Sequence, residues 1–271
     1  PLRRQRQMCI RDRTGIAHRH LKPTLGIVDP DNTVSLPSAV AAASGLDVLS
    51  HALESYTAMP FNERPMPPRP LERPAYQGSN PISDIWALTA LELMAEFLPN
   101  AVADTGDVEA REQMLLAAAL AGIGFGNAGV HLPHGMSYPV AGMVTSYIPP
   151  GYDVDHQIEP HGISVILNTP AVVRFTAPAS PERHLRAAAA LGADIAKASA
   201  EDAGEILADR VIHFMRILDV PNGLGAVGYT TADIPALVEG TLPQHRVTKL
   251  SPRPANESDL TSLFEASMTI W

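Results

Sequence analysis

Asp47 and His51 stand four residues apart in a segment with helical periodicity, so their side chains project from one face about one turn apart. That spacing suits two ligands of a single metal ion, and Glu54 extends the same face. A solvated ion pair is the alternative interpretation. However, the neighbouring residues are apolar: Leu46, Val48, Leu49, Ala52 and Leu53. Burying a carboxylate requires a compensating charge, which a metal supplies, so we predict a metal site.

Two further motifs contribute histidines. His131 and His134 are three residues apart, but Pro133 between them can break a helix, so they need not share a face. One core histidine and one capping histidine are the alternative. His161 begins an apolar helix, and a helix N-terminus disfavours an imidazolium, so we expect a neutral imidazole that can bind a metal. His156 lies in the preceding loop and is expected at the surface.

One carboxylate and three imidazoles form a ligand set that suits Fe²⁺ or Zn²⁺ and leaves a coordination position for a substrate. Helical metal phosphohydrolases also collect His and Asp residues. Their adjacent His-Asp pair is missing here, because the neighbouring pair runs in the order Asp155-His156.

The elements that must position these residues are mostly helices. Periodic apolar residues predict helices over 39–57, from Ser83 as N-cap, over 107–127, and near 133–143, 162–176, 181–191, 200–219, 231–240 and 257–270. Residues 24–30 predict one strand that ends in a turn. Residues 60–81 contain seven prolines and are expected to be irregular. The fold class is therefore mainly α with one strand, which is typical of the back half of a two-domain α/β enzyme.

Composition excludes several classes of protein. The 271 residues are 45% hydrophobic, which is ample for a core. A net charge of −9 argues against a nucleic-acid partner or an anionic membrane. The longest apolar stretch, 114–125, is too short to span a bilayer and predicts a buried helix. A single cysteine excludes internal disulfides and favours an intracellular, soluble protein.

Residues 1–13 differ from the rest of the chain. They hold five arginines and the only cysteine, without the serines of a mitochondrial transit peptide. Part of the segment back-translates to a transposase sequencing adapter read in frame. We therefore interpret residues 1–13 as a non-native adapter scar and expect the chain to be a fragment.

Longer motifs carry a family resemblance. The sequences GLDVLSHALESY (45–56) and AGIGFGNAG (121–129) resemble the iron-containing alcohol dehydrogenase superfamily. Closer still, RPAYQGSNPISD (73–84), HLPHGMSYP (131–139) and LPQHRVTKL (242–250) resemble its hydroxyacid-oxoacid transhydrogenase branch. The resemblance covers essentially residues 22–271.

The resemblance implies particular site residues. Matching the family's motif gives four metal ligands, namely Asp47, His51, His134 and His161. His131 falls where the wider family has a small residue and is left out. Tyr138, which stands where many members have a further histidine, and Phe125 are candidates to contact the nicotinamide. Arg246 and Lys249 are candidates to bind substrate carboxylates, with a solvated basic turn as the alternative.

The resemblance also implies a two-domain, dehydroquinate-synthase-like organisation. Residues 14–32 would be the remnant of an N-terminal dinucleotide-binding domain, and residues 33–271 the helical, metal-binding catalytic domain. The family's Gly-Gly-Gly-Ser phosphate-binding turn is absent, so NAD(H) would be bound mostly by a missing N-terminal domain. The metal would be Fe²⁺, with Zn²⁺ as the alternative.

The implied reaction uses small-molecule hydroxy acid and oxo acid substrates. 4-Hydroxybutanoate and 2-oxoglutarate would give succinate semialdehyde and 2-hydroxyglutarate, with hydride carried by bound NAD. An ordinary NAD(P)-dependent iron alcohol dehydrogenase and a non-catalytic metal-binding fragment are the alternatives. We expect no nucleic-acid or membrane partner, and a homo-oligomer is compatible with the sequence. The location would be mitochondrial in a eukaryote and cytoplasmic in a bacterium.

Overall fold

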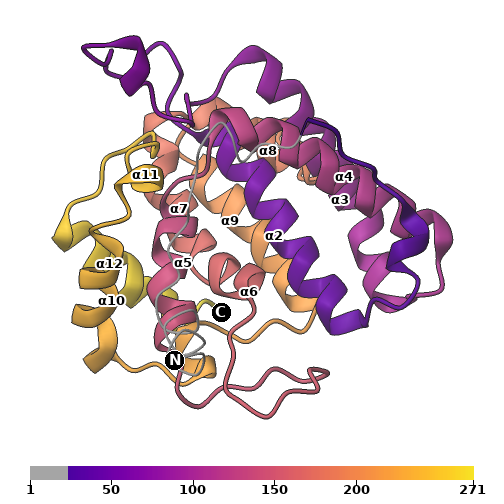
Figure 1. Cartoon of the computed structure of the whole chain (residues 1–271). Helices are drawn as coiled ribbons and strands as arrows, with labels where there is room; N and C mark the ends of the chain where they lie inside the picture. The colour runs from indigo at the N-terminus through magenta and orange to yellow at the C-terminus, as the bar shows by residue number, and fades with distance from the viewer. Residues whose placement is uncertain (1–23) are drawn as a thin grey trace.

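The computed structural model describes residues 24–271, which form a helical body (Figure 1). The predicted adapter scar at 1–13 and residues 14–23 of the predicted domain remnant lie outside the described residues. The α-helices are α2 (Ser38–Thr57), α3 (Pro81–Ala103), α4 (Val108–Ala128), α5 (Leu132–Met143), α6 (His161–Ile166), α7 (Thr169–Thr176), α8 (Pro181–Ala190), α9 (Ala203–Ile217), α10 (Ile234–Thr241), α11 (His245–Thr248) and α12 (Glu257–Ser267).

The predicted strand at 24–30 is wrong. Residues 24–29 are exposed and irregular, and the structure from residue 24 onward contains no strand, only an isolated bridge between Pro60 and Ser79. A strand needs a neighbour to accept and donate its backbone hydrogen bonds, and none of the described residues pairs with this segment as a strand. The turn that follows is confirmed as a short 3₁₀ helix, Pro30–Thr33.

The long helices agree with prediction except at two boundaries. α3 begins at Pro81 rather than at Ser83, because the side chain of Asn80 accepts the Ser83 N–H and is the N-cap. The single helix predicted over 162–176 is two helices, α6 and α7, separated at residues 167–168. Pro170 lacks the N–H that would continue the hydrogen-bond ladder of α6 into α7.

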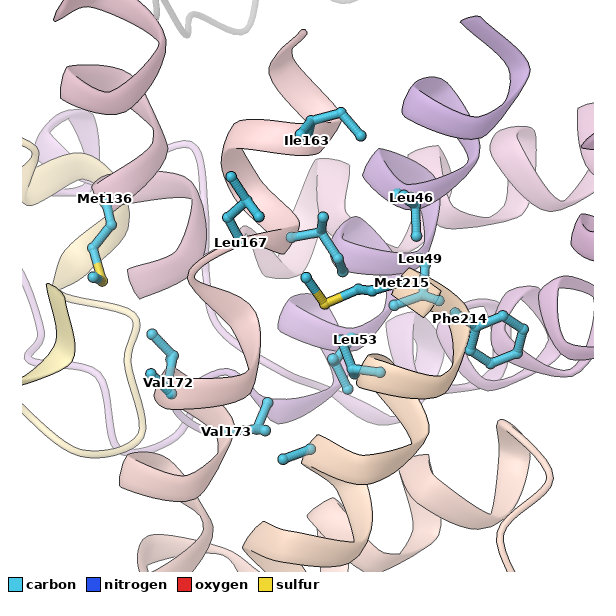
Figure 2. Close-up of a cluster of buried hydrophobic side chains, with 14 of the residues drawn as sticks. Leu46, Leu49, Leu53, Met136, Ile163, Leu167, Val172, Val173, Phe214 and Met215 are labelled. Carbon is cyan, nitrogen blue, oxygen red and sulfur yellow. The ribbon is translucent and has the colours of Figure 1, made fainter. Parts of the chain in front are cut away.

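α2 lies at the centre of the fold and contacts α3, α4, α6 and α8 (Figure 1). Its leucines Leu46, Leu49 and Leu53 are fully buried. Figure 2 shows them beside residues of α6, α7 and α9 in one apolar cluster. The opposite face of α2 carries Asp47, His51 and Glu54, so the core fixes the helix that presents these polar side chains.

The backbone of α6 packs directly against the backbone of α2, and Gly162 allows this close contact. A Cβ atom on Gly162 would lie 1.8 Å from the carbonyl oxygen of Ala43 and 3.0 Å from Cβ of Asp47. No side chain fits in that space. Because Gly162 has no side chain, the two helices can lie in contact, and His161, the preceding residue, is placed against the polar face of α2.

Gly129 ends α4 and turns the chain into α5. Its φ of 93° lies in the left-handed region that favours glycine, and a Cβ there would collide with Tyr76 and Leu250. The axes of α4 and α5 differ by 105° across this turn. The turn directs His131 and His134 towards α2.

α3 is long and apolar enough to cross a membrane by length and composition alone. Its buried residues, among them Leu91, Met94 and Leu98, lie on the helix that packs against both α2 and α4. One face of the helix therefore belongs to the core, and 33% of its apolar window is buried. The apolar stretch 114–125 lies within α4, so the predicted helix is confirmed, but its predicted burial is wrong for most of its length. Within the stretch Ala117, Ala121 and Gly124 are buried, while Leu116 and Ile123 are exposed.

Substituting Gly162 tests the close contact between α2 and α6. Gly162→Ala is expected to destabilise the protein by about 1–3 kcal/mol, because the new methyl group must push the two backbones apart. The matched control is Gly122→Ala in α4, where a Cβ would meet nothing within 4 Å. Denaturant unfolding should show the control unchanged or slightly stabilised. Equal stability of the two variants would contradict the contact.

Candidate metal centre

Four side chains from three helices converge on one point. Asp47 and His51 come from α2, His134 from α5 and His161 from the first position of α6. Asp47 Oδ1 lies 3.5 Å from His134 Nε2 and 3.8 Å from His161 Nε2, and Asp47 Oδ2 lies 3.9 Å from His51 Nδ1. The rings of His51 and His134 stack with centroids 4.6 Å apart. The structure thus brings together all four residues that the sequence predicts as ligands.

Glu54 forms a second layer behind this cluster. It is buried, its Oε1 lies 2.5 Å from His134 Nδ1, and its Oε2 accepts the backbone N–H of His131 at 2.6 Å. The contact engages Nδ1 of His134 and turns Nε2 towards Asp47. A carboxylate in this position is the usual partner that orients a metal-binding imidazole.

The electrostatics of the cluster favour positive charge at its centre. Burial alone would raise the pKa of Asp47, but His134 and His51 lower it to about 2. Burial alone would lower the pKa of His134, but the carboxylates of Glu54 and Asp47 raise it to about 9. Burial and the charge of His134 lower the pKa of His51 to about 4. Two carboxylates therefore remain ionised and attract a cation.

The donor set fits a metal ion. Asp47 Oδ1 and His134 Nε2 are buried and have no hydrogen-bond partner among the described residues, which is costly for polar atoms unless a ligand satisfies them. One donor atom each from Asp47, His51 and His134 lies within 4.8 Å of the others. Tetrahedral ligands around Fe²⁺ or Zn²⁺ lie about 3.3 Å apart for bonds near 2.0 Å. Asp47 Oδ1 and His134 Nε2 are already near this separation at 3.5 Å, whereas the other donor atoms, those of His161 included, would have to move closer to share one ion.

Aromatic rings flank the cluster. Phe125 stacks on His51 with centroids 4.0 Å apart, and Tyr138 stacks on His161 at 6.3 Å. Arg246 donates from Nη2 to the hydroxyl of Tyr138 at 2.9 Å, and its guanidinium lies 5.4 Å from the centre of the Tyr76 ring. Tyr138 and Tyr76 therefore hold the guanidinium of Arg246 beside the four proposed metal ligands.

Three other predicted residues lie elsewhere. Lys249 is exposed and lines a different pocket, with Met59 and Leu132. His131 is buried outside the cluster, with Nε2 lying 3.0 Å from Thr57 Oγ1. His156 is half exposed and pairs with Asp155, which confirms its predicted surface position.

Sequence reasoning missed what Glu54 and Tyr76 do. The sequence predicts that Glu54 shares the face of α2 that carries Asp47 and His51. Its spacing of seven residues from Asp47 puts it two turns away on that face. That signal could have identified a supporting carboxylate. Nothing in the sequence near Tyr76 signals its contact with Arg246, because the two residues come from segments far apart in the chain.

Residues 72–268 match the family described as "Fe-containing alcohol dehydrogenase family, C-terminal". The match covers more than half of the chain and includes His134 and His161, whereas Asp47 and His51 on α2 precede its first residue. The chain belongs to the iron-containing alcohol dehydrogenase family.

Relatives place it more narrowly. The chain is similar to the mitochondrial hydroxyacid-oxoacid transhydrogenase of Pongo abelii, with 60% identity over 95% of this chain and 55% of the relative. It is 59% identical to that of Xenopus tropicalis, over 97% of this chain and 57% of the relative. An archaeal alcohol dehydrogenase from a Red Sea brine pool matches with a TM-score of 0.78 and 25% identity, over 95% of this chain and 58% of that one. The chain spans about half the length of the curated relatives it matches.

Removing the carboxylate of Glu54 tests the second layer. Glu54→Leu is expected to lower the free energy of unfolding by about 3–5 kcal/mol, because it leaves the charge of His134 buried without its main partner. Glu92→Leu, at an exposed position of α3, is the control and should stay within about 0.5 kcal/mol. Urea unfolding of both variants measures the difference. A Glu54 variant as stable as the control would show that the buried pair carries no stability.

Proposed function

We propose that this chain supplies the metal-binding, catalytic half of a hydroxyacid-oxoacid transhydrogenase. The observation that carries the proposal is the convergence of Asp47, His51, His134 and His161, with Asp47 Oδ1 and His134 Nε2 buried and unsatisfied. The similarity to transhydrogenases at about 60% identity supports the reaction class. Residues 33–271 would form the catalytic domain, and residues 14–32 would be the remnant of a dinucleotide-binding domain.

Asp47, His51, His134 and His161 would hold the metal ion, Fe²⁺ in preference to Zn²⁺ by family. When bound, the ion would act as a Lewis acid that lowers the pKa of a substrate hydroxyl. The contribution of the protein is geometry and charge. Glu54 fixes the tautomer and orientation of His134, and Asp47 supplies the anionic ligand that offsets the charge of the ion.

NAD(H) would carry the hydride between the two substrates. Phe125 and Tyr138 stack on two of the proposed ligands, so each presents an aromatic surface at the rim of the cluster. We propose that this rim receives the nicotinamide, while a dinucleotide-binding domain holds the rest of the cofactor. The two rings would exclude water from the reacting atoms and orient the nicotinamide face.

Arg246 is the stronger candidate for binding a substrate carboxylate. Its hydrogen bond to Tyr138 and its position over Tyr76 restrain a guanidinium next to the metal ligands. A restrained guanidinium recognises a carboxylate through charge-assisted hydrogen bonds. Lys249, the second candidate, is turned into a separate pocket. The proposed pair of substrates, 4-hydroxybutanoate and 2-oxoglutarate, both carry carboxylates, and the curated relatives suggest a mitochondrial location.

Metal analysis tests the ligand set on this chain alone. The purified protein is expected to bind about one equivalent of Fe²⁺ or Zn²⁺, and His134→Ala and Asp47→Ala are expected to lose it. His156→Ala is the control, because His156 is exposed and lies outside the cluster. Unchanged metal content in His134→Ala, measured by elemental analysis with circular dichroism as a folding check, would refute the assignment.

The reaction is tested in a full-length chimaera, in which this chain replaces the segment that it matches in the Xenopus tropicalis relative. Without added NAD, the chimaera is expected to convert equal amounts of 4-hydroxybutanoate and 2-oxoglutarate. Strict dependence on added NAD would instead establish an ordinary dehydrogenase. Arg246→Met should raise KM about tenfold or more by removing a charge-assisted contact, while the exposed Arg186→Met should not. An unchanged KM in Arg246→Met would remove Arg246 from the substrate site.

A further inference from the structure

A second pocket lies on the side of α2 that faces α3 and α4. Its volume is about 220 Å³, and its walls are mainly apolar, including Leu36, Val48, Leu98 and Met114. It is small for a ligand pocket, since cofactor and drug sites usually measure about 300–1,000 Å³. Any ligand that fits must be compact and largely apolar.

One cation lines this pocket without a partner. Arg111 extends from α4, and its Nε and Nη1 atoms are buried with no hydrogen-bond partner among the described residues. Buried guanidinium nitrogens are costly unless an acceptor meets them. The pocket hydroxyls of Thr33 and Ser44 already donate to backbone carbonyl groups, and Thr105 contributes a third hydroxyl. Arg111 is the charged side chain in the lining and is therefore the group that would select an anionic partner.

We propose that this pocket binds a small monocarboxylate with an unbranched apolar chain. The carboxylate would accept hydrogen bonds from Arg111, and the chain would lie against Leu98, Met114 and the other apolar walls. A single cation matches a single negative charge. Nucleotides, sugar phosphates and dicarboxylates would bring further charged groups into a mainly apolar space that offers no second cation.

The proposal is independent of the proposed oxidoreductase function. Ser44, Gly45 and Val48 line the pocket from α2, whereas Asp47 and His51 project from the helix towards α5 and α6. The metal ligands do not line the pocket.

Isothermal titration calorimetry, in which octanoate is added to the full chain, tests the proposal. Octanoate is expected to bind with one site per chain, and uncharged octan-1-ol much more weakly. Arg111→Met should weaken octanoate binding about tenfold or more, the loss expected for a charge-assisted hydrogen bond. Arg186→Met is the matched control, since Arg186 is exposed on α8 and far from the pocket lining.

A second variant keeps the test decisive if Arg111→Met alters the fold. Ala118→Phe retains the cation but fills the pocket, and it should abolish octanoate binding while metal content stays unchanged. No octanoate binding by the unmodified chain, or equal affinity in Arg111→Met, would overturn the proposal. Self-association of the chain that octanoate does not reverse would assign the pocket to a second copy instead and would also overturn it.

Discussion

Two carboxylates on one helix impose the charge balance on which the site depends. Asp47 and Glu54 lie two turns apart on α2 and have lowered pKa values although burial opposes their ionisation. Negative charge in that position must be matched locally, and His134 is placed between them, with one ring nitrogen towards each. The turn at Gly129, which aims α5 at α2, therefore serves an electrostatic requirement as well as a packing one.

The same helix joins the site to the core. Leu46, Leu49 and Leu53 are fully buried on one face of α2, and Asp47, His51 and Glu54 project from another, so core packing holds the helix that carries the polar residues. At the C-terminal end of α2, Arg183 donates to the backbone oxygen of Tyr56 and to Asp84. An element held along its length and at its end presents its side chains in fixed positions, which is what a metal site requires.

Local features of the sequence predict much of this structure. The spacing of Asp47 and His51 fixes their shared face, and the apolar periodicity locates α2 and α4 within a residue or two. Contacts between distant segments could not be derived from spacing. The choice of His134 over His131 as a ligand came from resemblance to a family, and Tyr76 beside Arg246 gave no local signal. The strand at 24–30 failed for the same reason, because strand formation depends on a neighbour and not on β-branched residues alone.

The side chains proposed as metal ligands differ in their exposure to solvent, and this difference gives the site an inner and an outer side. The side chain of His134 is 3% exposed, whereas that of His161 is 32% exposed. Of the four proposed ligands, His134 would hold an ion from the interior and His161 from the solvent side. The coordination position left for a substrate would therefore be reached past His161 and not past His134.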